Sequence, residues 1–330
     1  MAFMNADLSI VPAGQGSLVP ADQGWSMPPI IAQAGPKASA RVIDFFAGQL
    51  RNENTRAAYI RAISEFLSCA QQRGLSLGQV SPGFVGAYLD SLPFSVPTKK
   101  QRLAALRVFF DWLVTGHVIE TNPAASVRGP KLVVREGKTP VLQEAELRQL
   151  FDSVPAVTLR DLRDRALLGV FVYTFARVSA VITMKVRDYR VGGRRADIHL
   201  QEKGGVINRV PVHHKLREFL DEYIEAAKLG KEPESWLWRS MPGRKDELSA
   251  KPMSRHDAHH LVKRRCAAAN LPVDICCHSF RGSGITLYLQ KGGNLEHAQK
   301  IAGHADPRTT RLYDRTGDVV SLDEVERIVF

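Results

Sequence analysis

The chain has 330 residues, of which 44% are hydrophobic, and this length allows two domains with separate apolar cores. Its formal net charge of +11 favours a polyanionic partner. No apolar run approaches the roughly 20 residues that a membrane-spanning helix needs, so we expect no membrane segment.

Residues 1–40 are predicted to be a disordered N-terminal extension. They hold five prolines and four glycines, and Lys37 is their one Lys or Arg. Such a composition is typical of segments that do not form a packed core. The segment also lacks the basic start and compact apolar run of a secretory signal, so we expect no export.

Residues 41–128 are predicted to form a compact helical domain, because their apolar residues recur at helical spacing. One helix runs from about residue 54 and stops at Gly74. Ser81, followed by proline, reads as the N-cap of a second helix. Thr98 and Gln101 fit a capping box for a third.

Basic side chains concentrate in two segments that we expect to face DNA. Residues 41–130 hold ten Lys or Arg against six Asp or Glu, and residues 254–315 hold ten against five, so both segments are positive. A solvated helix would explain the pattern in the third helix equally well. The candidate DNA-binding residues are Lys99, Lys100, Arg102, Arg107, Lys263 and Arg264.

Residues 129–140 are predicted to be an extended, basic interdomain linker, because glycine and proline recur at both of its ends. A second domain is predicted over residues 141–320. Helices are expected from Glu144, over about 159–175, and near 213–228, 254–269, 278–290 and 294–302, with a β-hairpin of runs 196–200 and 206–212. The predicted fold is therefore mostly α with a small antiparallel β-sheet.

Residues 321–330 carry their own helical pattern, with Ser321 as cap and an apolar face. Against its own domain this would be an ordinary terminal helix.

Six chemically capable side chains lie in the second domain. Arg177 follows the end of a predicted helix, and Lys203 lies in the hairpin turn before two glycines. A further arginine, two histidines and a tyrosine follow near the C-terminus. In chain order the six are Arg177, Lys203, His278, Arg281, His304 and Tyr313.

These residue types suit phosphoryl transfer. A phosphodiester under attack builds negative charge on its non-bridging oxygens, and a planar guanidinium such as that of Arg177 or Arg281 binds two such oxygens at once. His278 lies three residues before Arg281, so on a helix both face one side. The phenol of Tyr313 would be the nucleophile, made useful by cations that stabilise phenolate.

The remaining three residues have predicted roles in proton transfer and hydrogen bonding. Lys203, in a turn, would act as a general acid towards the departing 5′ oxygen. His304 would donate a hydrogen bond to the phosphate, and His278 would help to move the tyrosine proton.

The ordered set resembles the active site of the tyrosine recombinase (phage integrase) family over roughly residues 41–330. The resemblance implies a site-specific DNA recombinase in which a core-binding, SAM-like domain and a catalytic domain close as a clamp around DNA. It would act through a 3′-phosphotyrosyl intermediate and a four-way junction, without ATP, metal or other cofactor. The outcome would be integration, excision or resolution of a mobile element or replicon.

The resemblance also implies partners and location. We expect double-stranded DNA with inverted-repeat recombination sites, a dimer on one site and a tetramer in the synapse. The enzyme would be cytoplasmic, and associated with the nucleoid when bound to DNA.

One position departs from the family. Most members continue the arginine motif as R-x-S-E or R-x-S-D, whereas Ala180 follows Arg177-Val178-Ser179 here. If that carboxylate orients neighbouring groups, this chain orients them otherwise or has a looser site. A catalytically weakened DNA-binding protein of the same fold is therefore one alternative, and a type IB topoisomerase is a second.

A metal-dependent nuclease is the third alternative, and the motifs disfavour it because they include no acidic metal cluster. Cys276 and Cys277 precede His278, but adjacent cysteines do not easily both bind one zinc ion. We expect the four cysteines to be reduced thiols.

Overall fold

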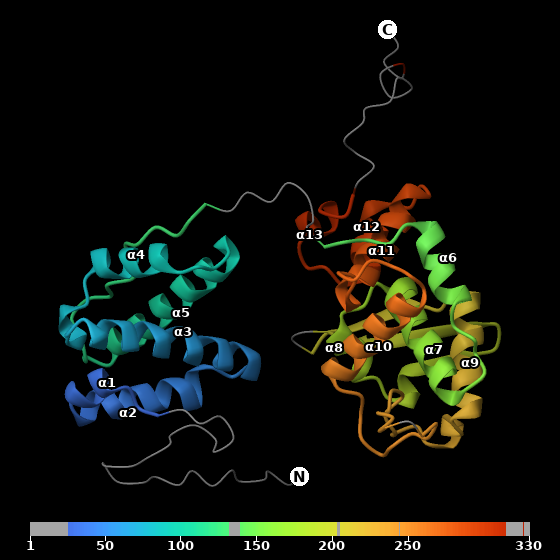
Figure 1. The fold of residues 1–330 in the computed structure, drawn as a ribbon, viewed down its shortest axis with the longest axis horizontal. Helices are drawn as coiled ribbons and strands as arrows, with labels where there is room; N and C mark the ends of the chain where they lie inside the picture. Colours follow the sequence, from blue (N-terminus) through green and yellow to red (C-terminus); the bar gives the residue numbers. More distant parts are fainter. Residues whose placement is uncertain (1–25, 132–138, 203–204, 244, 315–325, 327–330) are drawn as a thin grey trace. The chain divides into compact units, whose positions relative to one another are not determined.

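The computed structural model describes residues 26–131, 139–202, 205–243, 245–314 and 326. The chain divides into two compact units, residues 1–133 and 134–330. This division falls within residues 129–140, the predicted linker, of which 132–138 lie outside the described residues. Each unit is treated below by itself (Figure 1).

The described part of the first unit is helical. Its elements are α1 (Pro29–Gln33), α2 (Pro36–Asp44), the π-helix η1 (Phe45–Gln49), α3 (Glu53–Gln72), the 3₁₀ turn η2 (Leu77–Gln79), α4 (Pro82–Ser91) and α5 (Val96–Thr115). Helices α3 and α5 pack against each other, and α2 packs on α5. A cluster of phenylalanines, including Phe66, Phe109 and Phe110, fills the space between them.

The prediction of disorder is wrong for residues 26–40. Ile30, Ile31 and Ala38 are buried in the core of the first unit, on helices α1 and α2. Prolines that suggested disorder occupy the first turns of these helices, where a missing N–H costs nothing. Residues 1–25 lie outside the described residues.

Two predicted helix starts in this unit have different outcomes. The Ser81 cap is confirmed, since its Oγ accepts a hydrogen bond from the Phe84 N–H at 3.2 Å. The Thr98–Gln101 capping box is wrong, because α5 begins three residues earlier with Ser95 as N-cap. Pro97 fits the first turn, and the Thr98 hydroxyl lies 3.0 Å from that of Ser95.

The described part of the second unit is mixed. Its elements are α6 (Glu144–Asp152), α7 (Leu159–Thr174), α8 (Val178–Ile182), η3 (Val186–Asp188), β1 (Tyr189–Gly192), β2 (Arg195–Gln201), β3 (Ile207–Pro211), α9 (His214–Ala226), η4 (Leu229–Lys231), α10 (Arg255–Ala268), α11 (Cys277–Gln290), α12 (Leu295–Ala302) and α13 (Pro307–Arg311). The six predicted helices are confirmed to within a few residues. The short elements α8, β1 and α13 were not predicted.

The sheet is antiparallel in the order β1-β2-β3, which confirms the predicted hairpin. Ile198 of β2 faces Val210 of β3, and with Leu200 they bury one face of the sheet. Lys203 and Gly204, in the turn between β2 and β3, lie outside the described residues.

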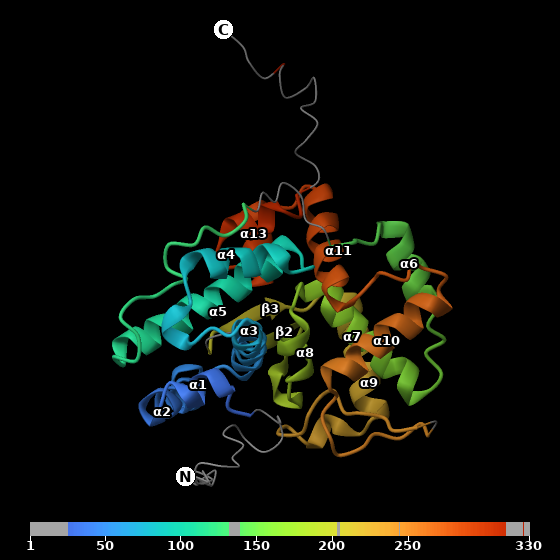
Figure 2. The same ribbon diagram turned by 60° about the vertical axis from the view of Figure 1, so that its left-hand side comes forward.

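Helix α7 lies at the centre of the second unit, against both α9 and α11 (Figure 1 and Figure 2). Its side chains are buried around almost its whole circumference, as expected for a helix covered on several sides. Asp164, which is 0% exposed, accepts hydrogen bonds from Arg163 beside it and from Arg264 and Arg265 of α10. This buried ionic network fixes α10 to α7.

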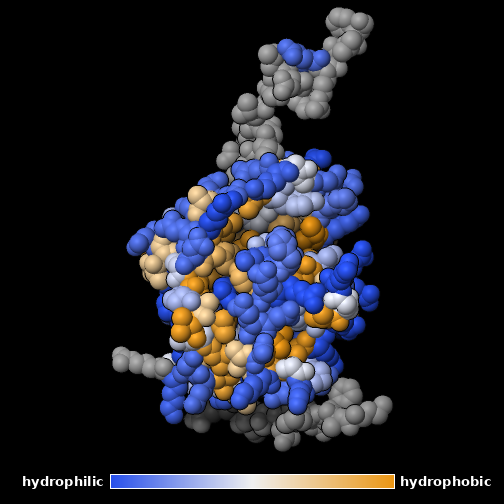
Figure 3. Space-filling model, turned by 90° about the vertical axis from the view of Figure 1, so that its right-hand side faces the viewer, coloured by the Kyte–Doolittle hydropathy of each residue, from blue (hydrophilic) through white to orange (hydrophobic). Residues whose placement is uncertain are grey.

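No helix within the described ranges is long and apolar enough to cross a membrane. On the face drawn in Figure 3, apolar patches are separated by hydrophilic residues. All four cysteines are free thiols, and among the placed side chains no three His, Cys, Asp or Glu gather as metal ligands.

Candidate active site

Arg177 is placed by the end of α7. Phe175 adopts the left-handed conformation (φ 53°, ψ 24°), which ends the helix and turns the chain outward. Arg177 then becomes the N-cap residue of α8. Its Nη1 donates to the Glu202 carboxylate at 2.6 Å, and its side chain remains 40% exposed.

Helix α11 carries the histidine–arginine pair. Its start is fixed by Ser279, whose Oγ accepts from the backbone N–H of Cys276 at 3.1 Å. Arg281 lies one turn after His278, is 1% exposed, and donates from Nη1 to the carbonyl of Phe175. Its Nε and Nη2 have no hydrogen-bond partner among the described residues, which is unusual for a buried cation.

His304 is held by a turn at the end of α12. Gly303 has φ 59°, a left-handed conformation that suits glycine, and the His304 N–H donates to the Gln299 carbonyl at 3.1 Å. The imidazole Nδ1 lies 2.8 Å from the Thr310 hydroxyl. When Thr310 donates to Nδ1, Nε2 carries the ring proton and can donate to an anion.

Tyr313 lies between the two histidines. Its ring stacks on that of His304, with 6° between their planes, and its hydroxyl lies 2.9 Å from Nε2 of His278. The Thr286 hydroxyl of α11 donates to the Tyr313 carbonyl at 3.1 Å. Ile285 belongs to the small apolar cluster that encloses the Tyr313 ring, which is only 7% exposed.

Burial and the two guanidinium groups set the protonation states. Burial lowers the pKa of His278 below its ordinary value, and the charges of Arg281 and Arg177 lower it further. The same causes, burial first, lower the pKa of His304 to about 3. Both rings are therefore neutral at neutral pH, so His278 is able to accept a proton.

The pKa of Tyr313 is raised by burial, while Arg281 and Arg177 act in the opposite direction. The phenol is therefore protonated in the free protein. Burial and the neighbouring Arg177 lower the pKa of Arg281 to about 10, which keeps this group charged at neutral pH.

Five of the six predicted residues meet at one place. Phe175 links the arginines, because Arg177 follows it in the chain and Arg281 binds its carbonyl. His278 contacts the Tyr313 hydroxyl and His304 stacks on its ring. Lys203 lies outside the described residues. The catalytic roles remain predictions.

Sequence reasoning missed three side chains that hold this group. Glu202 binds Arg177, Thr310 binds His304, and Thr286 binds the backbone of Tyr313. Only Glu202 had a signal, since it is an acidic residue directly before the candidate lysine.

The predicted DNA-facing role is wrong for Arg102. This side chain is buried and donates to Glu65 at 2.5 Å and to the Tyr88 hydroxyl at 3.3 Å, so it joins α3, α4 and α5. Arg107 is half-buried and donates to the backbone carbonyls of Ala124 and Val127. It holds the segment after α5 in place.

The other candidate DNA contacts stay predictions. Lys100 is exposed on α5, and the half-buried Lys99 donates to the Asp90 carbonyl at 3.1 Å. On α10, Lys263 donates to the Val273 carbonyl, and the exposed Arg264 takes part in the network around Asp164.

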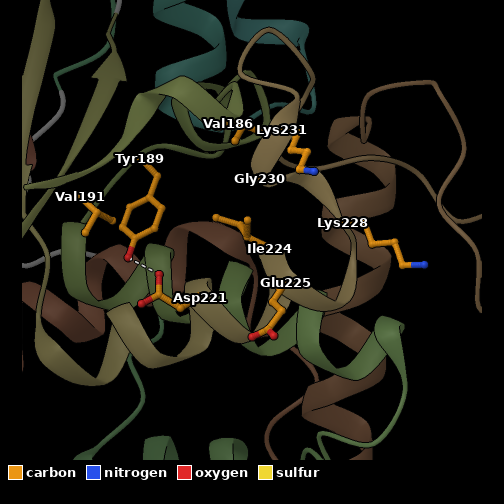
Figure 4. Close-up of a pocket in the computed structure, with 9 residues that line it drawn as sticks. All are labelled: Val186, Tyr189, Val191, Asp221, Ile224, Glu225, Lys228, Gly230 and Lys231. Carbon is orange, nitrogen blue, oxygen red and sulfur yellow. Dashed lines mark hydrogen bonds between the residues drawn. The ribbon is translucent and has the colours of Figure 1, made fainter.

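A pocket of the second unit lies apart from this group of residues. It is lined by β1, η3, α9 and η4, and none of the candidate residues contributes to it (Figure 4). The Tyr189 hydroxyl donates to the Asp221 carboxylate at 2.7 Å inside it. Burial, followed by this hydrogen bond, raises the pKa of Tyr189, so the phenol is not activated.

Comparison with known proteins agrees with the geometry. The phage integrase family matches residues 140–318, more than half of the chain, and the phage integrase N-terminal SAM-like domain matches residues 47–117. A tyrosine recombinase of Pseudothermotoga lettingae is 24% identical over 283 residues, 84% of this chain and 93% of that protein. Tyrosine recombinase XerD of Ralstonia nicotianae is 27% identical over 292 residues, 84% of this chain and 90% of that protein.

Solved structures share the fold at low identity. The XerH site-specific recombinase bound to palindromic difH substrate, in a post-cleavage complex, has a TM-score of 0.66 at 19% identity, over 93% of this chain and 89% of that chain. A lambda integrase dimer bound to a COC′ core site has a TM-score of 0.63 at 20% identity, over 92% and 86%. This chain and the two solved structures share an architecture of two mostly helical domains. The chain therefore belongs to the phage integrase family of tyrosine recombinases.

Proposed function

We propose that this protein is a site-specific DNA recombinase that uses Tyr313 to cut one strand and rejoin it to another. The observation that carries the proposal is the 2.9 Å contact between the Tyr313 hydroxyl and Nε2 of His278, a ring kept neutral by burial and by nearby guanidinium groups. A neutral imidazole beside a phenol is the arrangement that proton transfer requires.

The proposed reaction conserves the phosphodiester. Tyr313 Oη attacks phosphorus and passes its proton to His278, while the bond from phosphorus to the 5′ oxygen breaks. Lys203 donates the proton that this oxygen needs to leave as a hydroxyl. Attack by a 5′ hydroxyl on the phosphotyrosine then reverses these steps and releases the enzyme.

The charge that develops on the phosphate would be stabilised by three side chains that donate hydrogen bonds. Arg281 supplies Nε and Nη2, which lack other partners among the described residues, and Arg177 supplies the donors that Glu202 does not use. His304 donates from Nε2. Because Arg281 is only 1% exposed, the side chains around it have to move apart when DNA binds.

The substrate would be double-stranded DNA with inverted-repeat sites, bound by a dimer on each site and joined by a tetramer in synapsis. Solved relatives of this fold include recombinases bound to such DNA substrates, which supports DNA as partner. Residues 321–330, of which the structure describes residue 326 alone, would dock on the neighbouring protomer. The enzyme would act in the cytoplasm, where its DNA lies, in integration, excision or resolution.

Replacement of the phenol tests the proposal. Tyr313→Phe should bind DNA normally and form no covalent adduct with a nicked suicide duplex, as read on a denaturing gel in the presence of EDTA. Tyr288→Phe is the matched control, since this ring also packs on Phe175 but lies outside the candidate set. A normal adduct with Tyr313→Phe would remove Tyr313 as nucleophile.

Two alternatives remain, and different observations decide them. The curated relatives are tyrosine recombinases, which favours recombination over relaxation of supercoils by a topoisomerase. A DNA-binding protein that has lost catalysis remains favoured only by Ala180. Tight binding by the wild type without any adduct would establish that alternative.

A further inference from the structure

We propose that Glu202 is a positioning residue for Arg177, in a chain whose position 180 holds alanine rather than an acidic residue. The inference rests on the proposed function of Arg177 as a phosphate-binding group. The contact that carries the inference joins Arg177 to Glu202, which lies 25 residues later in the chain.

Position 180 offers no acidic group to the site. Ala180 lies in α8, is 2% exposed, and belongs to the main apolar core of the second unit with Val181 and Ile182. Any group that orients Arg177 therefore has to come from another element.

Glu202 supplies that group from the end of the sheet. Its Oε2 accepts from Arg177 Nη1 at 2.6 Å, while its own side chain is only 7% exposed. An ion pair with one buried partner is screened less than a surface pair, and charge-assisted hydrogen bonds are the strong ones. The contact therefore restricts the rotamers of an arginine that is otherwise 40% exposed.

The backbone of Glu202 is fixed as well. Its N–H donates to the Val206 carbonyl at 2.8 Å, which extends the β2–β3 pairing by one step, and its carbonyl accepts from Gly205 at 3.3 Å. A Cβ at Gly303 would lie 3.5 Å from Oε1 of Glu202, so the carboxylate is next to the turn that carries His304. Glu202 thus ties Arg177 to the end of the β2–β3 pairing, beside the turn that carries His304.

One hydrogen-bond donor of Arg177, Nη1, binds Glu202, and its other donors remain for the phosphate. A guanidinium has five N–H donors in a fixed plane, so anchoring Nη1 on Glu202 sets the direction in which the other donors point. The Glu202 carboxylate itself repels phosphate, so it does not add to DNA affinity. Its effect should therefore appear in the cleavage rate. Misplacement of a reacting group by about 1 Å can cost about 10²-fold in rate.

The test measures adduct formation at saturating protein on the suicide duplex, and DNA affinity by gel shift. Glu202→Ala should slow adduct formation by about 10- to 100-fold, with affinity unchanged or higher. Glu202→Gln, which keeps the acceptor oxygen and the shape, should retain an intermediate rate. Glu222→Gln removes a carboxylate that pairs with Arg165 elsewhere in the second unit and should cleave like the wild type.

A double-mutant cycle with Arg177 identifies the route of the effect. If Glu202 acts through Arg177, adding Glu202→Ala to Arg177→Ala should cause no further loss of rate. Fully additive losses, or a wild-type rate for Glu202→Ala, would overturn the inference. Failure of the wild type to form an adduct would instead overturn the proposed function, so the two failures are distinct. Thermal unfolding of the near-isosteric Gln variant separates a rate effect from loss of the fold.

Discussion

At the scale of single residues, the site combines two charged guanidinium groups with two imidazoles and a phenol that burial keeps neutral. The pKa values of His278 and His304 lie below their ordinary range, and that of Tyr313 lies above it. The free protein therefore holds a protonated phenol beside a neutral acceptor. In the proposed reaction, transfer of that proton would become favourable only when phosphorus is there to accept the oxygen.

The charge of Arg177 should be measurable in the titration of His278. We expect a pKa below about 6.5 for this ring in the free protein, and Arg177→Gln should raise it because a nearby cation is lost. NMR titration of the ring proton checks both statements. Arg308→Gln, at an exposed position, should leave the value unchanged, and equal shifts in the two variants would contradict the assignment.

Four of the six candidate residues, His278, Arg281, His304 and Tyr313, could be predicted from the sequence because their spacing in the last sixth of the chain is informative. Their supporting contacts could not. The Arg177–Glu202 pair spans 25 residues, and the burial of Arg102 depends on Glu65 and Tyr88, which come from other helices. Helical spacing alone places a basic residue on a face but does not reveal what covers that face.

At the scale of elements, α10 is held to α7 by charge as well as by apolar packing. Asp164 is completely buried and accepts from arginines of both helices. Arg265 also binds Asp161 at 2.6 Å, so the network has two acceptors on α7. These contacts set the direction of α10, which leads to the helix that carries His278.

Asp164→Ala should lower the free energy of unfolding by about 3–5 kcal/mol, because it removes the buried carboxylate that Arg163 and Arg265 share. Urea denaturation measures the change. Glu218→Ala, which breaks an exposed pair with Lys215, should cost less than about 1 kcal/mol. Equal losses in the two variants would contradict the role given to the network.

The long helices were predictable because their apolar spacing and caps are local signals. The shorter α8 and α13, of five residues each, are too short to show a periodic pattern. The start of α5 was misplaced because Ser95 and Thr98 are both good caps, and the position of Pro97 decides between them. Helices α1 and α2 were missed because they lie in the segment 1–40, whose five prolines and four glycines suggested disorder.

At the scale of the whole molecule, each unit has its own apolar core. One core is built from α1 to α5 and contains Phe45 and Phe66, and the other surrounds α7 and contains Phe171 and Trp238. Separate cores mean that the energy of folding is mostly gained within each unit.

The two units should therefore fold independently. Fragments 26–131 and 139–330, expressed separately, should each show a cooperative thermal transition by circular dichroism. A fragment that gave no cooperative transition would contradict this expectation. Because the first fragment includes α1 and α2, a version starting at residue 46 is the control, and it should be less stable since Ile30, Ile31 and Val42 are lost from its core.

The shielding of Tyr313 affects which molecules the enzyme can modify. A phenol that is 7% exposed, with its ring against His304 and its oxygen against His278, is poorly reached by small solutes. Nitrating or iodinating reagents should label the half-buried Tyr59, Tyr173 and Tyr288 of the free protein first. Small phosphodiesters should be poor substrates for the same reason, because they lack the extended contacts that would uncover the oxygen. Selectivity for long DNA would thus begin with access to a single atom, the hydroxyl oxygen of Tyr313.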